Sequence, residues 1–198
     1  MKVFGTPTSP YVRRVRVIAR ELGLPYELVD IRTEEGQATL KAHTPIWKVP
    51  AALVEGRILF DSRNISDALV AKHGFGPLRP VADDFVPERN FMHVVDGALD
   101  AGIRVFYATR DGLSDDVPLV AKERARLRSC VDWLEKNVRG AFCTDEDGFG
   151  LAELALVSAL DWMRFRDAYD VSACPRLVAF QAAHQERPSL VETRPSET

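Results

Sequence analysis

The order in which strand and helix patterns follow one another constrains the fold of this chain more than any other feature. Met1–Phe4 is a short apolar run, and turn-forming residues separate it from a helical pattern that opens at Ser9-Pro10. Serine is a favoured N-cap, and proline suits the first helical position. Gly23 ends this pattern, and Tyr26–Ile31 has the composition of a second strand. A strand, a helix and a strand in this order predict two parallel strands with a right-handed crossover.

The helix between these strands is predicted to be amphipathic. Its apolar residues recur at helical spacing and are Val12, Val15, Ala19 and Leu22. We expect the arginines Arg13, Arg16 and Arg20 to form its solvated face.

Residues 32–75 predict a hairpin followed by a helix. A short helix is expected near Gln37–Ala42 in a polar stretch. Ala51–Val54 and Arg57–Phe60 are short strands, joined by a Glu-Gly pair that suits a two-residue hairpin turn. Ser62 then precedes an amphipathic segment that predicts the next helix.

Strand patterns end near residue 75, and helical patterns follow. Pro77, Pro80 and Pro87 punctuate the intervening stretch, which is typical of a linker. The later helical patterns cover residues 88–110, 119–138, 151–166 and 175–185. We therefore expect a first domain at residues 1–75, a linker at 76–87 and a helical domain at 88–198.

The charge and composition exclude several classes of protein. The net charge of −3 argues against nucleic-acid binding, which normally uses a basic surface. Residues 1–75 hold 11 basic and 8 acidic residues, a net of +3, and the remainder holds 15 and 21, a net of −6. A cationic first domain would favour a small anionic ligand. No apolar run reaches the roughly 18 residues of a membrane span, so we expect a cytoplasmic protein without a membrane partner.

The three cysteines, Cys130, Cys143 and Cys174, are widely spaced in the second half of the chain. This spacing fits neither a disulfide framework nor a zinc site. We expect structural thiols and no metal.

Four stretches of the chain are specific enough to compare with known families: SPYVRRVRVIARELGLPYE, KVPAALVEGRILFDS, DGALDAG and RPSLVETRP. Together they resemble the soluble glutathione transferases, and most closely the bacterial members with serine at the thiol-activating position. The resemblance implies an α/β thioredoxin-like N-terminal domain, an all-α C-terminal domain and a homodimer. It also implies glutathione as co-substrate in the detoxification of a small, hydrophobic electrophile.

By this resemblance, Ser9 stabilises the thiolate of bound glutathione. A free thiol of this kind titrates near ~8.5, so an enzyme must favour the ionised form. A hydroxyl donor at a helix N-terminus can do so. The alternative is that Ser9 only caps its helix, with Thr6 and Thr8 nearby as substitutes. No cysteine lies near position 9, which disfavours the members that work through a mixed disulfide.

The resemblance also assigns the residues that bind glutathione. Val49 and Pro50 match a pair in which a cis-proline presents the preceding backbone to the cysteinyl part, and Lys48 would lie beside them. Asp61 and Ser62 match an acidic-serine pair that holds the γ-glutamyl end, with Ser62 at a helix N-terminus that suits an anion. The alternatives are that Pro50 is an ordinary trans proline, that Lys48 is a surface lysine and that Ser62 is only a helix cap.

The resemblance gives further assignments, each of which has an alternative. Arg14 falls where serine-type relatives have an arginine behind the active site, or it is an exposed helix charge. Asp96 and Asp100 match a helix that reaches the partner subunit's glutathione in some classes, or they are solvated carboxylates. Phe106 and Tyr107 would line an electrophile pocket between the domains, or they belong to the core.

Two positions depart from the family pattern. Its usual Asn-Pro-x-Gly reads Thr44-Pro45-Ile46-Trp47 here, which would put a large ring beside the ligand. The usual Ser-x-x-Asp capping box reads Gly150-Leu151-Ala152-Glu153, and we expect Glu153 still to reach back to the helix start. Two other functions stay open: a non-catalytic glutathione-binding partner protein of this fold, and a glutathione-dependent reductase or isomerase.

Overall fold

The computed structural model describes residues 1–145 and 147–197, which form two compact units. The first unit comprises Met1–Leu78 together with the residues from Arg187 onward, and the second is Arg79–Glu186. The residues from Arg187 onward therefore pack with the first unit, whereas the sequence interpretation placed them in the helical domain.

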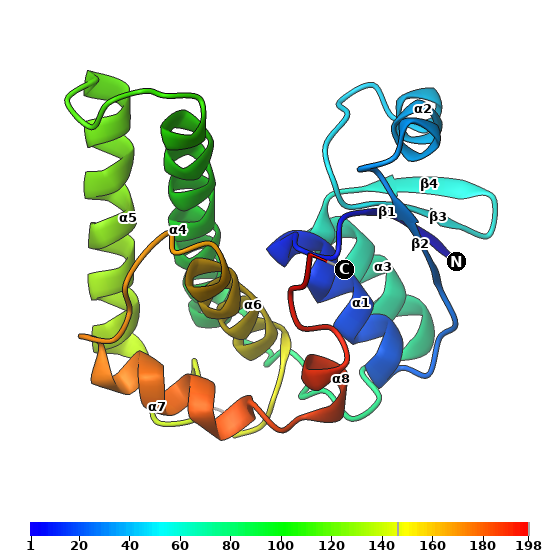
Figure 1. Cartoon of the computed structure of the whole chain (residues 1–198). Helices are drawn as coiled ribbons and strands as arrows, with labels where there is room; N and C mark the ends of the chain where they lie inside the picture. Colours follow the sequence, from blue (N-terminus) through cyan, green and yellow to red (C-terminus); the bar gives the residue numbers. More distant parts are fainter. Residues whose placement is uncertain (146, 198) are drawn as a thin grey trace. The chain divides into compact units, whose positions relative to one another are not determined.

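The first unit is an α/β domain of thioredoxin-like type (Figure 1). Its elements are β1 (Lys2–Gly5), α1 (Pro10–Glu21), β2 (Glu27–Asp30), α2 (Glu34–His43), β3 (Ala51–Val54), β4 (Arg57–Phe60), α3 (Ser62–His73) and α8 (Pro188–Val191). The sheet order is β2-β1-β3-β4. β1 and β2 are parallel, as the β-α-β pattern predicts, and the other two pairs are antiparallel. α1 and α3 cover one face of the sheet, and α2 lies over the other.

Successive side chains of β1 point to opposite faces of the sheet, so the core of this unit lies on both faces. Phe4 packs with Leu40 of α2 and with Ala51, while the adjacent Val3 points to the other face. Gly5 ends the strand where α1 passes very close, since a Cβ there would lie 2.3 Å from a methyl carbon of Val12. Glycine is therefore required for α1 to start so near the sheet.

Two helices differ from their predicted extent. α2 begins at Glu34 rather than near Gln37, because the Thr33 side chain accepts a hydrogen bond from Gly36 N at 3.0 Å and caps the helix earlier. The short α8 had no predicted counterpart, because its four residues are too few to show a helical period.

The second unit consists of helices packed on one another. They are α4 (Val86–Arg110), α5 (Pro118–Asn137), α6 (Leu151–Phe165) and α7 (Pro175–His184). α4 packs against both α5 and α6, and α6 is buried along almost its whole length, as its strongly apolar sequence predicts. Among the described residues, no helix is both long and apolar enough to cross a membrane.

Candidate active site

The strand register of the first unit brings three separate segments to one end of the sheet. Phe4, near the end of β1, pairs with Ala51, which also pairs with Phe60 at the end of β4. The segment that leaves β1 leads to Ser9, Pro50 precedes β3, and the segment that leaves β4 leads directly into α3. The N-termini of α1 and α3 therefore lie at the same end of the sheet, where the positive ends of both helix dipoles favour an anionic ligand.

Ser9 is the N-cap of α1 and is half-buried. Its Oγ accepts a hydrogen bond from Val12 N at 3.3 Å, so the capping role is present. Capping uses only an acceptor site of the hydroxyl, which keeps its own proton as a donor. The cap and a thiolate-binding role are therefore compatible. Thr6 and Thr8 lie beside it, with their hydroxyl oxygens 3.1 Å apart, and Thr8 is buried.

The bond between Val49 and Pro50 is cis, which confirms the predicted isomer. Pro50 is buried and Val49 half-buried, whereas Lys48 is exposed. The preceding Trp47 is 62% exposed, and its ring lies 5.3 Å from the Lys41 ammonium. The large ring therefore lies on the surface, stacked against a lysine.

Asp61 and Ser62 form the start of α3, but the capping residue differs from the one that the sequence suggested. Asp61, rather than Ser62, is the N-cap, and its Oδ1 accepts a hydrogen bond from Arg63 N at 2.8 Å. Ser62 is buried in the first turn, and its carbonyl oxygen accepts a hydrogen bond from Ser66 Oγ at 2.6 Å. An exposed carboxylate thus adjoins a serine at a helix N-terminus.

The arginines of α1 are less exposed than their sequence positions predicted. Arg20 is exposed and Arg16 half-buried, but Arg13 is only 1% exposed and Arg14 is also buried. The prediction of a solvated Arg13 was wrong. The signal that could have corrected it is the pair Val17 and Ile18, which widens the apolar stripe of α1 until little of the helix is left for solvent.

The aromatic pair of α4 lies in the second unit. The Phe106 and Tyr107 rings are 5.4 Å apart, and Phe106 meets Trp162 edge-on at 6.1 Å. Phe106 also lines a cavity of about 320 Å³ with Arg124 and Arg166 among its walls, while Tyr107 is 48% exposed. Phe106 therefore combines a core contact with a cavity wall.

The acidic residues named on α4 lie about one turn apart. Asp96 is half-buried and Asp100 is exposed. Cys143 is buried, and burial, together with the nearby Glu153 carboxylate, raises the pKa of its thiol well above the ordinary value. This thiol is therefore protonated at neutral pH and is no nucleophile. Within residues 1–145 and 147–197, no three acidic, histidine or cysteine residues gather as a metal would require.

The start of α6 holds a charged cluster that the sequence revealed only in part. Glu153 is fully buried, and its carboxylate accepts hydrogen bonds from Gly150 N and Cys143 N, both at 2.8 Å. The predicted reach of Glu153 to the helix start is confirmed. Arg79 was not foreseen: its guanidinium contacts Glu153 at 3.4 Å and Glu88 at 3.2 Å. Arg79 contacts carboxylates on two different helices, one of them 74 residues away, so no local sequence pattern could predict these contacts.

A mixed four-stranded sheet covered by helices, followed by a helical unit, defines a protein with a thioredoxin-like first domain and a helical second region. Residues 3–78 match the family described as the N-terminal domain of glutathione S-transferase. The whole chain resembles a glutathione S-transferase structure from Methylobacterium radiotolerans in complex with glutathione sulfonate, at a TM-score of 0.85 and 26% identity, covering 100% of this chain and 95% of that one.

Two further proteins agree with this likeness. A glutathione S-transferase structure from Methylobacillus flagellatus with glutathione bound has a TM-score of 0.85 and 25% identity, covering 98% of this chain and 99% of the other. The uncharacterized GST-like protein YibF of Escherichia coli is 26% identical, over 84% of this chain and 83% of its own length. Residues 3–78 therefore match the N-terminal domain of the glutathione transferase family, and the chain as a whole is similar to glutathione transferases.

Proposed function

We propose that this protein is a glutathione transferase in which Ser9 stabilises the thiolate of bound glutathione for attack on a small, hydrophobic electrophile. The observation that carries the proposal is the meeting of three segments at one end of the sheet: the N-terminus of α1, the cis-proline before β3 and the N-terminus of α3. The glutathione and glutathione sulfonate of the two similar transferase structures support the choice of ligand.

The proposed binding mode divides glutathione among these segments. The backbone of Val49 faces the cysteinyl part, with Lys48 beside it. Ser62 presents its hydroxyl and N–H to the α-carboxylate, where the positive end of the α3 dipole favours an anion. The exposed Asp61 carboxylate pairs with the ammonium group. Arg14, buried in α1, lies behind the thiol without touching it.

The proposed reaction is a nucleophilic attack. The ionised sulfur donates an electron pair to an electrophilic carbon, a sulfur–carbon bond forms, and a leaving group departs with its bonding pair or a double bond accepts the electrons. The Ser9 hydroxyl donates a hydrogen bond to the sulfur and favours the thiolate, because an O–H donor stabilises a negative charge more than a neutral thiol. For the electrophile, we propose contacts from Phe106 and Tyr107.

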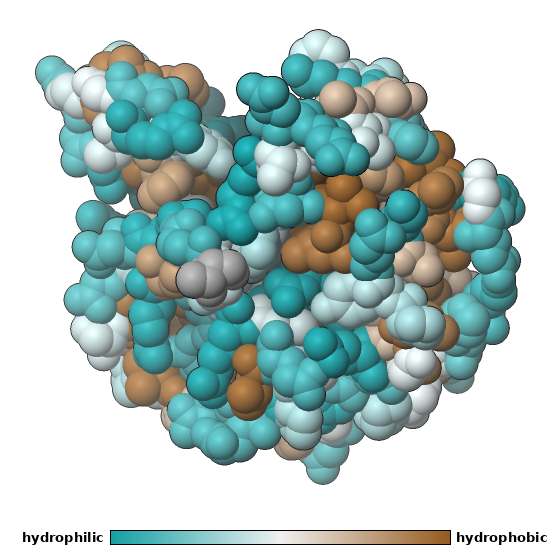
Figure 2. All heavy atoms as spheres, turned by 45° about the vertical axis from the view of Figure 1, so that its right-hand side comes forward, coloured by the Kyte–Doolittle hydropathy of each residue, from teal (hydrophilic) through white to brown (hydrophobic). Residues whose placement is uncertain are grey.

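We also propose that the protein is a homodimer, as the resemblance of its sequence to the family implies. Large hydrophobic side chains such as Ile46 of the first unit and Leu119 of the second are more than half exposed, and Figure 2 shows hydrophobic areas between hydrophilic ones on one face. A second copy would cover part of such surface. Light scattering at micromolar concentration tests this, and a monomer that binds glutathione normally would contradict it.

The test of thiol activation is Ser9→Ala. The variant should raise the pKa of the bound thiol by about 1–2 units, since a hydrogen bond to a charged group contributes about 1.5–3 kcal/mol. Turnover at neutral pH should fall, while glutathione affinity should stay nearly unchanged because the charged ends of the ligand are held elsewhere. Thiolate absorbance in the ultraviolet, followed against pH, measures the shift.

Asp61→Ala is the matched control and should behave in the opposite way. It should weaken glutathione binding with little effect on the pKa of the glutathione that does bind. An unchanged thiol pKa and turnover in Ser9→Ala would reduce Ser9 to a helix cap. Binding of glutathione without turnover on aryl halides, epoxides, isothiocyanates or peroxides would favour the non-catalytic partner protein, and activity on disulfides or maleyl compounds would favour the reductase or isomerase.

A further inference from the structure

The C-terminal strap, defined as residues 187–197, runs along α1 of the first unit. α8 lies beside the C-terminal end of α1 (Figure 1). There, Arg187 donates two hydrogen bonds to the Glu21 carboxylate, at 2.7 and 2.8 Å, and Ser189 Oγ donates a third. Burial raises the pKa of Glu21, but these hydrogen bonds outweigh it and lower the pKa overall. The carboxylate is therefore ionised at neutral pH and holds this end of the strap.

Arg13 holds the strap at a second point, about two turns closer to the start of α1. Its Nη2 donates to Leu190 O at 3.0 Å, and its Nε donates to Thr193 Oγ1 at 3.3 Å. Thr193 is fully buried, and its hydroxyl in turn donates to Ser189 O at 2.7 Å. A buried guanidinium is unfavourable unless its N–H groups are hydrogen-bonded. Here the strap supplies two of the acceptors.

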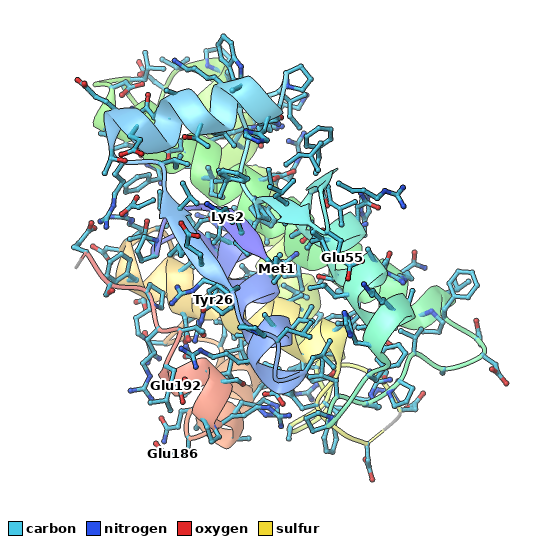
Figure 3. The ribbon with its side chains drawn as sticks, turned by 90° about the vertical axis from the view of Figure 1, so that its right-hand side faces the viewer. Met1, Lys2, Tyr26, Glu55, Glu186 and Glu192 are labelled. Atoms are coloured by element: carbon cyan, nitrogen blue, oxygen red, sulfur yellow. The ribbon has the colours of Figure 1, made fainter. Side chains whose placement is uncertain are left out.

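The strap depends on these polar contacts because it is not packed on all sides. A cavity of about 870 Å³ lies between the strap and the turn from α1 to β2, with Tyr26 and Glu192 among its lining residues. Figure 3 shows both residues on the same side of the molecule, with Tyr26 above Glu192. The exposed ion pair between Arg20 and Glu192 adds little, since surface pairs contribute only weakly. Glu21 and Arg13 are therefore the main fixed points.

Arg13 is also tied to the start of the helix. Its backbone N–H donates to Ser9 O at 3.0 Å, which is the hydrogen bond that closes the first turn of α1. The side chain of Arg13 is thus fixed to the strap, while its backbone N–H closes the first turn of α1. We propose that Arg13 is a positioning residue for Ser9, and that the C-terminal strap sets the orientation of the Ser9 hydroxyl through it. This inference rests on the proposed role of Ser9 in thiol activation.

The test uses a matched pair of substitutions at Thr193 in the full chain. Thr193→Val keeps the shape of the side chain but removes the acceptor for Arg13 Nε, whereas Thr193→Ser keeps the hydroxyl. Thr193→Val should raise the pKa of the bound glutathione thiol by about half a unit to one unit, which lowers the thiolate fraction at pH 7 by up to about tenfold. Thr193→Ser should match the wild type. Glutathione affinity should stay within about twofold in both.

Two more variants complete the experiment. Arg13→Lys keeps the positive charge but loses the planar donor set, and it should shift the thiol pKa in the same direction as Thr193→Val. Glu192→Gln removes only the exposed ion pair between the strap and α1 and should leave the thiol pKa unchanged. If Arg13→Lys does not fold, Thr193→Val, which retains Arg13, decides the question.

Ser9→Ala separates failure of this inference from failure of the proposed function. If Ser9→Ala shifts the thiol pKa while Thr193→Val and Arg13→Lys only lower the melting temperature, Arg13 is a purely structural residue and the inference is wrong. If Ser9→Ala itself leaves the thiol pKa unchanged, the proposed function fails, and the positioning role falls with it.

Discussion

The two units depart from the family's sequence pattern in opposite directions. In the first unit, Trp47 occupies a position where the resemblance to the family implies glycine, and in the second, Gly150 occupies a position where it implies serine. Trp47 keeps a backbone conformation that favours glycine, with a φ of 51°, and its side chain lies on the surface. Gly150 has a φ of −120°, which any residue can adopt. Gly150 is therefore important because it has no side chain, and not because its backbone is flexible.

The space that a side chain would fill at Gly150 is taken by Arg79. A Cβ at this position would lie 3.0 Å from Nη2 and 3.2 Å from the carbonyl oxygen of Arg79. Burial lowers the pKa of Arg79, but the adjacent Glu153 and Glu88 outweigh it and raise the pKa overall. A departure from the family pattern becomes part of the fold when buried charges depend on it, as at Gly150. It stays local when only solvent and one lysine adjoin it, as at Trp47.

The largest effect on stability is expected from Glu153→Ala in the second unit. The substitution leaves the buried Arg79 without one carboxylate and removes the acceptor of two backbone N–H groups. Breaking one partner of a buried ion pair costs about 3–5 kcal/mol. Urea unfolding should show a loss of this size in the free energy of unfolding. Glu153→Gln removes the charge but keeps an acceptor oxygen, so it should lose less, and equal losses in the two variants would contradict the contribution of the two backbone hydrogen bonds.

A smaller loss is expected when the family's serine is restored in Gly150→Ser. Serine would gain an N-cap hydroxyl, which contributes roughly a few tenths of a kcal/mol relative to glycine. Its Cβ would however press on Arg79, and overpacking costs about 1–3 kcal/mol. We expect net destabilisation in urea unfolding. Gly150→Ala separates the two effects, because it adds the crowding without the hydroxyl. A stabilised Gly150→Ser would mean that Arg79 moves aside freely, and it would contradict the claim that Arg79 excludes a side chain at this position.

The smallest effect is expected when the family's glycine is restored in Trp47→Gly. Relief of the left-handed backbone stabilises by roughly 1–2 kcal/mol. Loss of the exposed contact with Lys41 costs about 0.5–1 kcal/mol, and the flexibility of glycine in the unfolded chain costs a similar amount. These contributions nearly cancel, so the free energy of unfolding should change by less than about 1 kcal/mol. A larger loss by urea unfolding would show that the ring stabilises the first unit.

Local patterns in the sequence determined most of the secondary structure. The bounds of β3 and β4 agree with the predicted strands, and the Ser-Pro start of α1 and the apolar run of α6 lie where the sequence places them. These features depend on caps, turns and periodicity within a few residues, so each was visible without its neighbours in space. The candidate site residues Ser9, Asp61 and Ser62 lie in short motifs as well, but their roles were implied by the resemblance to the family.

Only the tertiary structure decided which charges are buried and what satisfies them. Arg13 meets Leu190 and Thr193 across more than 170 residues, and Arg79 meets Glu153 across 74. A buried arginine and a solvated one have the same helical spacing in the sequence, because periodicity records where apolar residues fall and not which distant segment returns to cover a helix. The partners that stabilise a buried charge are chosen by long-range packing, which no local pattern encodes.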